Sequence, residues 1–185
     1  MTAHVLVPVK RLDGAKSRLA DVLTPEERTE LMLEMLGTVL AAVREAEVGP
    51  VTVVSPEPLE IHGVPRFDDR GLRWNDALAA AVDAAVTEPV VAIVAGDLPR
   101  LGTEDVRELV AATPQRGLAV ARAKDGGTNA VSMRPPGIVR THFGEPASSL
   151  VHMEAARRAG VEAVVLDVDG LAFDVDTAED LALWR

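Results

Sequence analysis

The hydrophobic residues of this chain gather in short continuous runs, separated by stretches in which apolar residues recur every three or four positions. Such runs are typical of parallel strands that are covered on both faces of a sheet. The strongest predicted strands are residues 4–9, 51–55, 90–95 and 161–167. A weaker strand is expected over 61–67, and two further strands over 117–123 and 129–133, joined by the turn at 124–128.

The stretches between these runs predict helices. The clearest helix start combines Thr24 as N-cap, Pro25 at the first helical position and Glu27 as the second member of a capping box. An apolar stripe follows and the helix is expected to end near Gly49-Pro50; the stripe is Leu31, Met35, Val39 and Ala42. Further helices are expected over 72–86, from Thr103 to about residue 112, from Ser148 or Ser149 to Gly160, and from Thr177 to Trp184.

Strands that alternate with helices predict an α/β fold, with a mixed, mostly parallel sheet and helices on both faces. No linker or internal repeat interrupts the chain, so we expect a single domain over 1–185. The hairpin-like pair around Gly126-Gly127 adds at least one antiparallel strand. Ligands of such sheets bind at the carboxyl ends of the strands, where Lys10, Asp97 and Asp174 are expected to converge.

Composition removes several classes of function. The 185 residues include no cysteine, which excludes disulfides, thiolate metal sites and a thiol nucleophile. No apolar run is long enough for a membrane span, and the N-terminal run is too short for a signal peptide. The formal charge of −10 argues against non-specific nucleic-acid binding. We therefore expect a cytoplasmic protein with small-molecule partners and no nucleic-acid or membrane partner. A homodimeric assembly is a separate expectation that the composition does not address.

Carboxylates at strand ends are the first candidates for chemistry. Asp97 follows the most apolar predicted strand directly after Gly96, and glycine lets the backbone approach a ligand closely. Near the C-terminus, Asp174 and Asp176 lie two residues apart, and either of them could face the same cleft. Mg²⁺ prefers oxygen ligands and is commonly held by one or two carboxylates together with substrate phosphates. The alternative for each aspartate is an ordinary turn or helix-entry residue.

Three loops could bind anions. The loop after the first strand carries Lys10, Lys16 and Arg18, although it matches neither a dinucleotide fingerprint nor a Walker loop. The segments 126–129 and 143–149 offer backbone N–H groups and hydroxyls, and the second precedes a predicted helix. Taken singly, each fits ordinary turn and cap chemistry. The four histidines form no zinc spacing, and packing roles are expected for Trp74 and Trp184.

In their order and spacing, six motifs resemble the 2-phospho-L-lactate guanylyltransferases, also described as phosphoenolpyruvate guanylyltransferases. The resemblance covers nearly the whole chain. The motifs are Val7-Pro8-Val9-Lys10, Ala15-Lys16-Ser17-Arg18-Leu19, Gly96-Asp97-Leu98-Pro99, Gly126-Gly127-Thr128-Asn129-Ala130, Phe143-Gly144 with Ser148, and Asp174-Val175-Asp176-Thr177.

The resemblance implies a nucleotide-diphospho-sugar-transferase-like fold and a role in making the side chain of coenzyme F-420. It implies that Asp97 and Asp174 hold Mg²⁺. The residues implied to bind the phosphorylated acid are Thr128 or Asn129, Gly144 and Ser148. The residues implied to face the GTP phosphates are Lys10, Lys16 and Arg18. Asn75 falls in a segment that resembles the family's nucleotide-proximal stretch, with Arg73-Trp74 departing from its pattern.

The reaction so implied joins GTP to a small phosphorylated three-carbon acid and releases pyrophosphate. It needs no protein nucleophile, which fits the lack of any cysteine. Two alternatives stay open: another nucleotidyltransferase, such as one acting on molybdopterin, and a nucleotide-binding regulatory module without turnover. The acceptor is also open among 2-phospholactate, phosphoenolpyruvate and 3-phosphoglycerate, because methyl-scale differences change binding by only about 1–3 kcal/mol.

Overall fold

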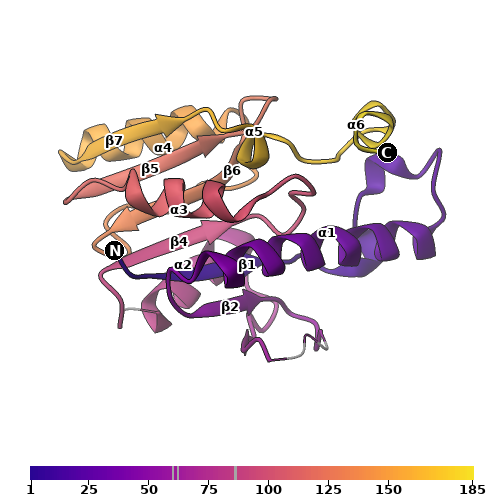
Figure 1. The fold of residues 1–185 in the computed structure, drawn as a ribbon, viewed down its shortest axis with the longest axis horizontal. Coiled ribbons are helices and arrows are strands. Elements are labelled where there is room, and N and C mark those ends of the chain that lie inside the picture. Colours follow the sequence, from indigo (N-terminus) through magenta and orange to yellow (C-terminus); the bar gives the residue numbers. More distant parts are fainter. Residues whose placement is uncertain (60, 62, 86) are drawn as a thin grey trace.

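The sheet of this protein has seven strands, in the order β3-β2-β1-β4-β6-β5-β7. The structure is a computed structural model that describes residues 1–59, 61, 63–85 and 87–185. Figure 1 shows the strands running across the molecule from β2 to β7. Their bounds are β1 Ala3–Pro8, β2 Val51–Val54, β3 Arg66–Phe67, β4 Val90–Val94, β5 Gly117–Arg122, β6 Thr128–Arg134 and β7 Glu162–Leu166. The predicted mostly parallel, mixed α/β sheet is confirmed.

One strand, β6, runs against both of its neighbours. It pairs antiparallel with β4, where Val94 lies opposite Ala130, and antiparallel with β5. The remaining pairs, β1 with β2 and β4, β2 with β3, and β5 with β7, are parallel. The start of β6 therefore lies at the same edge of the sheet as the carboxyl ends of β1 and β4. This reversal brings residues 128 and 129 beside the segment that leaves β4.

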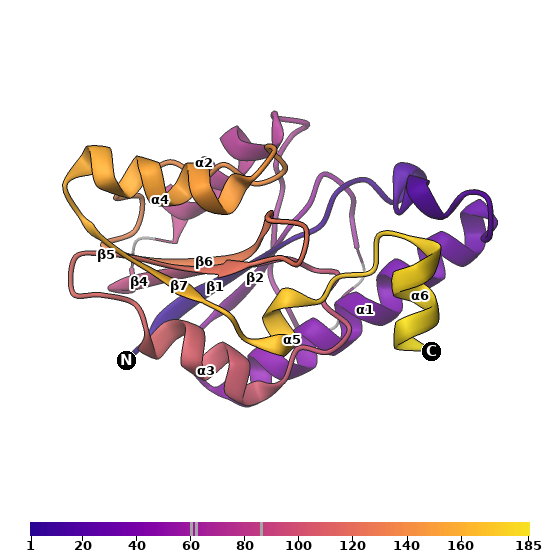
Figure 2. The ribbon, with the colours of Figure 1, turned by 90° about the horizontal axis from the view of Figure 1, so that it is seen from above.

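Helices cover both faces of the sheet (Figure 2), with α1, α3 and α5 on one side and α2 and α4 on the other. The bounds are α1 Pro25–Ala46, α2 Trp74–Ala84, α3 Thr103–Ala111, α4 Ser148–Ala159, α5 Asp169–Ala172 and α6 Ala178–Trp184. Alternate strand residues feed the two cores. In β4, Val90, Ala92 and Val94 pack beneath α1 and α3, whereas Val91 and Ile93 pack beneath α2. Within the described residues, no helix combines the length and apolar character of a membrane span.

Helix starts follow the local sequence where a side chain provides the cap. Thr24 and Glu27 form the predicted capping box of α1, and Thr177 forms another with Asp180 at α6. Two predicted caps are wrong. At α3 the N-cap is Gly102 rather than Thr103, and the Asp105 carboxylate accepts the Gly102 N–H. At α4 the N-cap is Ala147 rather than a serine, in the left-handed conformation.

Three other elements differ from the sequence predictions. The weak strand expected over 61–67 is only Arg66–Phe67, and residue 62 lies outside the described residues. The helix expected over 72–86 spans Trp74–Ala84, and residue 86 is likewise outside them. Short helices that no periodicity indicated occur at Leu12–Gly14, Ser17–Leu19 and Asp169–Ala172. Helices of three or four residues are too short to show a 3.6-residue repeat.

The β5–β7 pair depends on the absence of a side chain at Gly117. A Cβ added there would lie 2.0 Å from the backbone oxygen of Glu162, its partner across the pair. We expect Gly117→Ala to lower the free energy of unfolding by about 1–3 kcal/mol, because backbone atoms have to move apart. Urea denaturation followed by circular dichroism measures this loss.

The matched control is Gly37→Ala in the middle of α1, where an added Cβ meets no atom within 4 Å. Alanine is the better helix former, so this variant should gain about 0.5–1 kcal/mol. Equal stability of the two variants would show that the β5–β7 contact is more compliant than its geometry indicates.

Candidate active site

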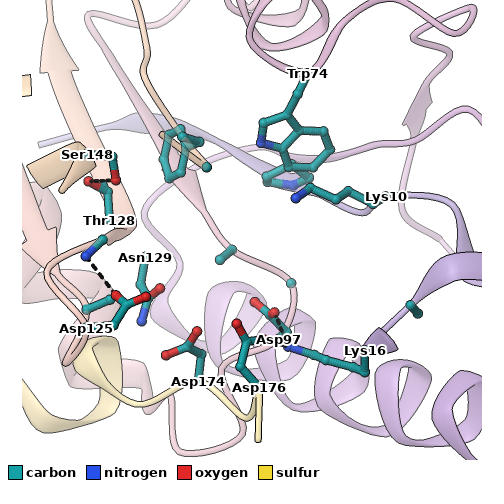
Figure 3. A pocket seen from close by; sticks show the side chains of 18 of the residues that line it. Lys10, Lys16, Trp74, Asp97, Asp125, Thr128, Asn129, Ser148, Asp174 and Asp176 are labelled. Atoms are coloured by element: carbon teal, nitrogen blue, oxygen red, sulfur yellow. Dashed lines mark hydrogen bonds and ion pairs between the residues drawn. The ribbon is translucent and has the colours of Figure 1, made fainter. Parts of the chain in front are cut away.

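A cavity of about 710 Å³ opens at the edge of the sheet where β1 and β4 end and β6 begins. Figure 3 shows its three walls. One wall is basic and aromatic, with Lys10 and Trp74; one is polar, with Thr128, Asn129 and Ser148; and the third carries Lys16 and a group of carboxylates, Asp97, Asp174 and Asp176. The convergence predicted for Lys10, Asp97 and Asp174 is confirmed.

The basic residues of the cavity, Lys10, Lys16 and Arg18, come from the loop that follows β1. Lys16 has a positive φ of 49°, and this backbone conformation precedes the short helix Ser17–Leu19. Its ammonium is almost buried, with a side chain that is 5% exposed. By contrast, Arg18 is largely exposed, and Lys10 Nζ lies 5.0 Å from the centre of the Trp74 ring. The loop thus supplies one enclosed cation and two that are open to the cavity mouth.

Two of the three carboxylates, those of Asp97 and Asp176, pair with Lys16. Lys16 Nζ donates to Asp97 Oδ2, and it donates to Asp176 Oδ1 at 2.9 Å. Arg18 adds a longer contact to the other oxygen of Asp176, at 3.3 Å. Burial alone would lower the pKa of Lys16, but attraction by Asp97 and Asp176 outweighs it and the pKa is raised. Lys16 is therefore the charged counterion of this carboxylate group.

Asp174 lies beside this group. Burial raises the pKa of Asp174 to about 6, and repulsion by Asp97 and Asp176 adds to the rise. Lys16 and the side-chain amide of Asn129 oppose it, although the amide nitrogen makes no well-formed hydrogen bond. Attraction by Lys16 therefore does not offset the burial of Asp174 and its repulsion by the other two acids. Additional positive charge at this position would lower the pKa of Asp174 again.

The packing of Gly96 and of residues 173–176 determines where the carboxylates lie. At Gly96 an added Cβ would lie 3.1 Å from the Pro8 carbonyl oxygen, so the exit of β4 runs tight against the end of β1. Near the C-terminus, Phe173 and Val175 are buried in the core, which leaves Asp174 and Asp176 facing the cavity. The structure thus brings both aspartates to the cleft, where the sequence left the choice between them open.

The polar wall joins β6 to the start of α4. Ser148 Oγ donates to Thr128 Oγ1 at 3.0 Å, and both side chains are buried against the cavity. Asn129 is also buried, and its Nδ2 has no hydrogen-bond partner within the described part of the chain. A buried amide without a partner is rare in a folded protein and commonly marks a place for a ligand atom or water.

The first turn of α4 has no side-chain cap. Since Ala147 occupies the N-cap position, Ser148 is the first helical residue and its hydroxyl serves Thr128 instead. The neighbouring Gly144 has a positive φ of 77° and lines the cavity. The dipole of a helix start that faces a cavity favours an anionic group there, although the Ser149 N–H already donates to the Gly126 carbonyl oxygen at 3.4 Å.

Asn75 does not line the cavity. Its Nδ2 donates to the Phe143 carbonyl at 3.1 Å, and its Oδ1 accepts from Phe143 N and Thr141 Oγ1. All three contacts hold the loop that carries Gly144, so the nucleotide contact implied for Asn75 would be indirect. The adjacent Trp74 lines the cavity instead. The departure of Arg73-Trp74 from the family pattern is the sequence feature that could have drawn attention to Trp74.

Oxygen donors suited to Mg²⁺ are present at this site. Asp97, Asp174 and Asp176 are hard oxygen ligands, and burial together with repulsion by the other two raises the pKa of Asp174. Within the described residues, no group of three or more histidine or acidic side chains is arranged to hold a metal ion by itself. Incomplete protein ligation is ordinary for Mg²⁺, which keeps waters and substrate phosphates in its shell. The donor set therefore fits Mg²⁺ bound together with a phosphorylated substrate.

Comparison with known sequences supports the family resemblance. A family model described as "Guanylyl transferase CofC like" matches residues 3–183. A phosphoenolpyruvate guanylyltransferase of Sphaerobacter thermophilus is 40% identical over 190 residues, covering 98% of this chain and 91% of the relative. A 2-phospho-L-lactate guanylyltransferase of Haloarcula marismortui is 38% identical over 169 residues, covering 90% and 78%.

Structural comparison agrees on the fold. A crystal structure from Desulfovibrio desulfuricans G20, described as a nucleotide-diphospho-sugar transferase, superposes with a TM-score of 0.83. It is 20% identical and covers 99% of this chain and 86% of the other. At that identity the likeness establishes the architecture alone. The predicted nucleotide-diphospho-sugar-transferase-like fold is thereby confirmed.

The position of Lys16 leads to a stability prediction. Lys16→Met keeps the length of the side chain but leaves Asp97 and Asp176 without their enclosed partner. We expect a loss of about 1–3 kcal/mol in the free energy of unfolding at neutral pH in the presence of a chelator, because a charged hydrogen-bond partner is lost. Thermal or urea denaturation measures it.

Arg18→Met is the control, since Arg18 contacts the same Asp176 from an exposed position. Exposed ion pairs contribute little, so its loss should stay below about 1 kcal/mol. Equal losses in both variants would contradict the role of Lys16 as the principal counterion.

Proposed function

Because the chain belongs to the family of CofC-like guanylyltransferases, we propose that it transfers a guanylyl group from GTP to a small phosphorylated three-carbon acid and releases pyrophosphate. Relatives named as phosphoenolpyruvate and 2-phospho-L-lactate guanylyltransferases support both acceptors. The product would supply the side chain of coenzyme F-420. A cytoplasmic location, a homodimeric assembly and dependence on Mg²⁺ belong to the same proposal.

One observation carries this proposal: the cavity combines a group of carboxylates with basic residues and with a polar wall in which the buried amide nitrogen of Asn129 has no partner among the described residues. GTP brings three phosphates, which need cations on one side. The acceptor brings a phosphate and a carboxylate, which need several donors in a small volume. The basic loop suits the first set of groups, and the start of α4 with Asn129 suits the second.

In the proposed reaction, a phosphate oxygen of the acceptor attacks the α-phosphorus of GTP. A new P–O bond forms, the bond between the α-phosphorus and the bridging oxygen breaks, and pyrophosphate leaves with that electron pair. The acceptor phosphate is already ionised near neutral pH, so no protein base has to remove a proton. Catalysis then rests on positioning and on charge stabilisation.

The chain's own residues divide these tasks. Lys10, Lys16 and Arg18 would neutralise the triphosphate as charge builds on pyrophosphate. The residues that would orient the acceptor are Thr128, Asn129, Gly144 and Ser148. Asp97 and Asp174, with Asp176 beside them, would hold Mg²⁺. The ion would supply electrostatic stabilisation of the phosphoryl oxygens.

The metal assignment predicts the behaviour of two variants. Asp97→Asn and Asp174→Asn keep the size of each side chain but remove a charged oxygen ligand. We expect turnover to fall by about 100-fold or more in each, because charge stabilisation is lost while the fold persists. Pyrophosphate release at saturating substrates measures turnover, and circular dichroism checks folding.

Asp13→Asn is the matched control, since Asp13 lies on the loop after β1, is largely exposed and pairs only with Arg11 among the described residues. Its turnover should match the wild type. Wild-type protein should lose activity in a chelator and regain it with Mg²⁺. Near-normal turnover of both test variants would remove these aspartates from the metal site.

Nucleotide and acceptor choice are tested in one assay. We expect faster pyrophosphate release with GTP than with ATP, CTP or UTP, and only when phosphoenolpyruvate or 2-phospholactate is present. Equal rates with ATP would contradict guanylyl specificity. Nucleotide binding without pyrophosphate release, with any acceptor, would instead indicate a regulatory module.

A further inference from the structure

His152 is a buried histidine that none of the roles above uses. It lies on α4, one turn after Ser148, and is fully buried. Its ring packs edge-on against Phe143 and His142, with centroids 5.5 and 5.6 Å away. Both of its ring nitrogens are hydrogen-bonded to groups that frame the polar wall of the cavity. It therefore touches both segments from which the proposed acceptor pocket is built.

Two backbone groups fix the protonation of this ring. His142 N lies 2.9 Å from Nε2, and a backbone N–H can only donate, so Nε2 has to accept. The Ser148 carbonyl oxygen lies 2.8 Å from Nδ1 and can only accept, so Nδ1 carries the proton. In a charged ring Nε2 would also carry a proton, so two donors, Nε2–H and the His142 N–H, would face each other. The backbone thus selects the neutral imidazole with its proton on Nδ1.

The electrostatic surroundings agree with a neutral ring. Burial lowers the pKa of His152 to about 4, while the hydrogen bond to the Ser148 carbonyl opposes the change. The charged groups near it act in opposite directions, His142 lowering and Glu145 raising that pKa. The imidazole is therefore uncharged throughout the neutral range of pH.

This tautomer determines what the Thr128 hydroxyl can do. Nδ1–H also faces Thr128 Oγ1 at 3.2 Å, so Thr128 cannot donate to His152. Ser148 Oγ donates to the same Thr128 oxygen at 3.0 Å. Thr128 Oγ1 accepts from both, and its own proton is left without a protein acceptor on that side. Thr128 lines the cavity.

We propose that His152 is a positioning residue that turns the Thr128 hydroxyl into an obligate donor aimed into the acceptor pocket. This rests on the proposed function of that pocket. Thr128 O–H then presents a donor to the ligand, on the opposite face of β6 from the Asn129 amide, which lies beside Asp174. The ligand chemistry this donor favours is a fully ionised acid, with carboxylate or phosphate oxygens that only accept. Acids that offer a hydroxyl or amide proton at the same place would meet a donor and be disfavoured.

Two substitutions at His152 separate the two halves of its role. The amide of asparagine reaches the place of Nδ1, so His152→Asn retains a donor toward Ser148 and Thr128. The amide of glutamine reaches the place of Nε2, so His152→Gln retains only the acceptor for the His142 N–H. We expect His152→Gln to raise the acceptor KM by about tenfold or more, as for loss of a hydrogen bond to a charged group. His152→Asn should restore most of it, and the GTP KM should stay the same in both.

Thr128→Val gives the coupled measurement. It removes the hydroxyl at nearly constant volume and should raise the acceptor KM as much as His152→Gln does. Combined with His152→Gln it should add little, because both remove the same donor. Fully additive effects would overturn the proposal, as would equal rises in KM for the Asn and Gln variants with equal losses of thermal stability, which indicate packing alone.

A readout without turnover tests the tautomer itself. In ¹⁵N spectra of the wild-type protein, the His152 ring should show a protonated Nδ1 and a bare Nε2 from pH 6 to 9. His142, which is partly exposed and pairs with Glu145, serves as the internal comparison. A protonated Nε2 or a charged ring in that range would overturn the proposal even if guanylyl transfer is observed. The expected tautomer without any transfer would instead contradict the proposed function.

Discussion

The antiparallel pairing of β6 with β4 is the constraint on which the cavity depends. In a sheet of otherwise parallel strands, that reversal turns the start of one strand toward the ends of the others. Ala95 N donates to Asn129 O at 2.8 Å, so the exit of β4 and the entry of β6 are tied by a backbone bond. Asp97 and Asn129 follow from this contact as near neighbours. A parallel β6 would place its polar residues at the opposite edge of the sheet.

The sequence predicts those features whose physical cause is local. The capping box at Thr24 and Glu27 fixes the start of α1 through side chains three residues apart, and a continuous apolar run identifies β4. Asp97 was a candidate because its strand, glycine and proline are consecutive. The position of Ser148 was mispredicted because its hydroxyl has a partner twenty residues earlier, and that contact replaces the capping bond that local sequence favours.

Other site features depend on contacts that no window of sequence contains. The sequence offers only a core role or an anion contact for His152, because its partners lie ten and twenty-four residues away on two separate segments. The choice between Asp174 and Asp176 could not be made, since a two-residue alternation places both on one side and does not say which side is the cavity. Asn75 lies in a segment that resembles a family motif, yet its amide is hydrogen-bonded to the 141–143 loop, which lies far from it in sequence. The motif predicts roughly where Asn75 lies, and only the tertiary contacts show what its side chain does.

The ion pair of Lys16 with Asp176 spans 160 residues and joins the two ends of the chain. Phe173 and Val175 bury themselves in the core, while the aspartates that alternate with them reach the cavity. Docking of the C-terminal segment and completion of the carboxylate group are therefore one event. By mass action, any ligand that binds only the completed group also resists detachment of this segment, by about 2.7 kcal/mol at one hundred times its Kd. Site occupancy and order in the C-terminal segment are thus thermodynamically linked, so a substrate-saturated molecule is also one whose tail is harder to cleave.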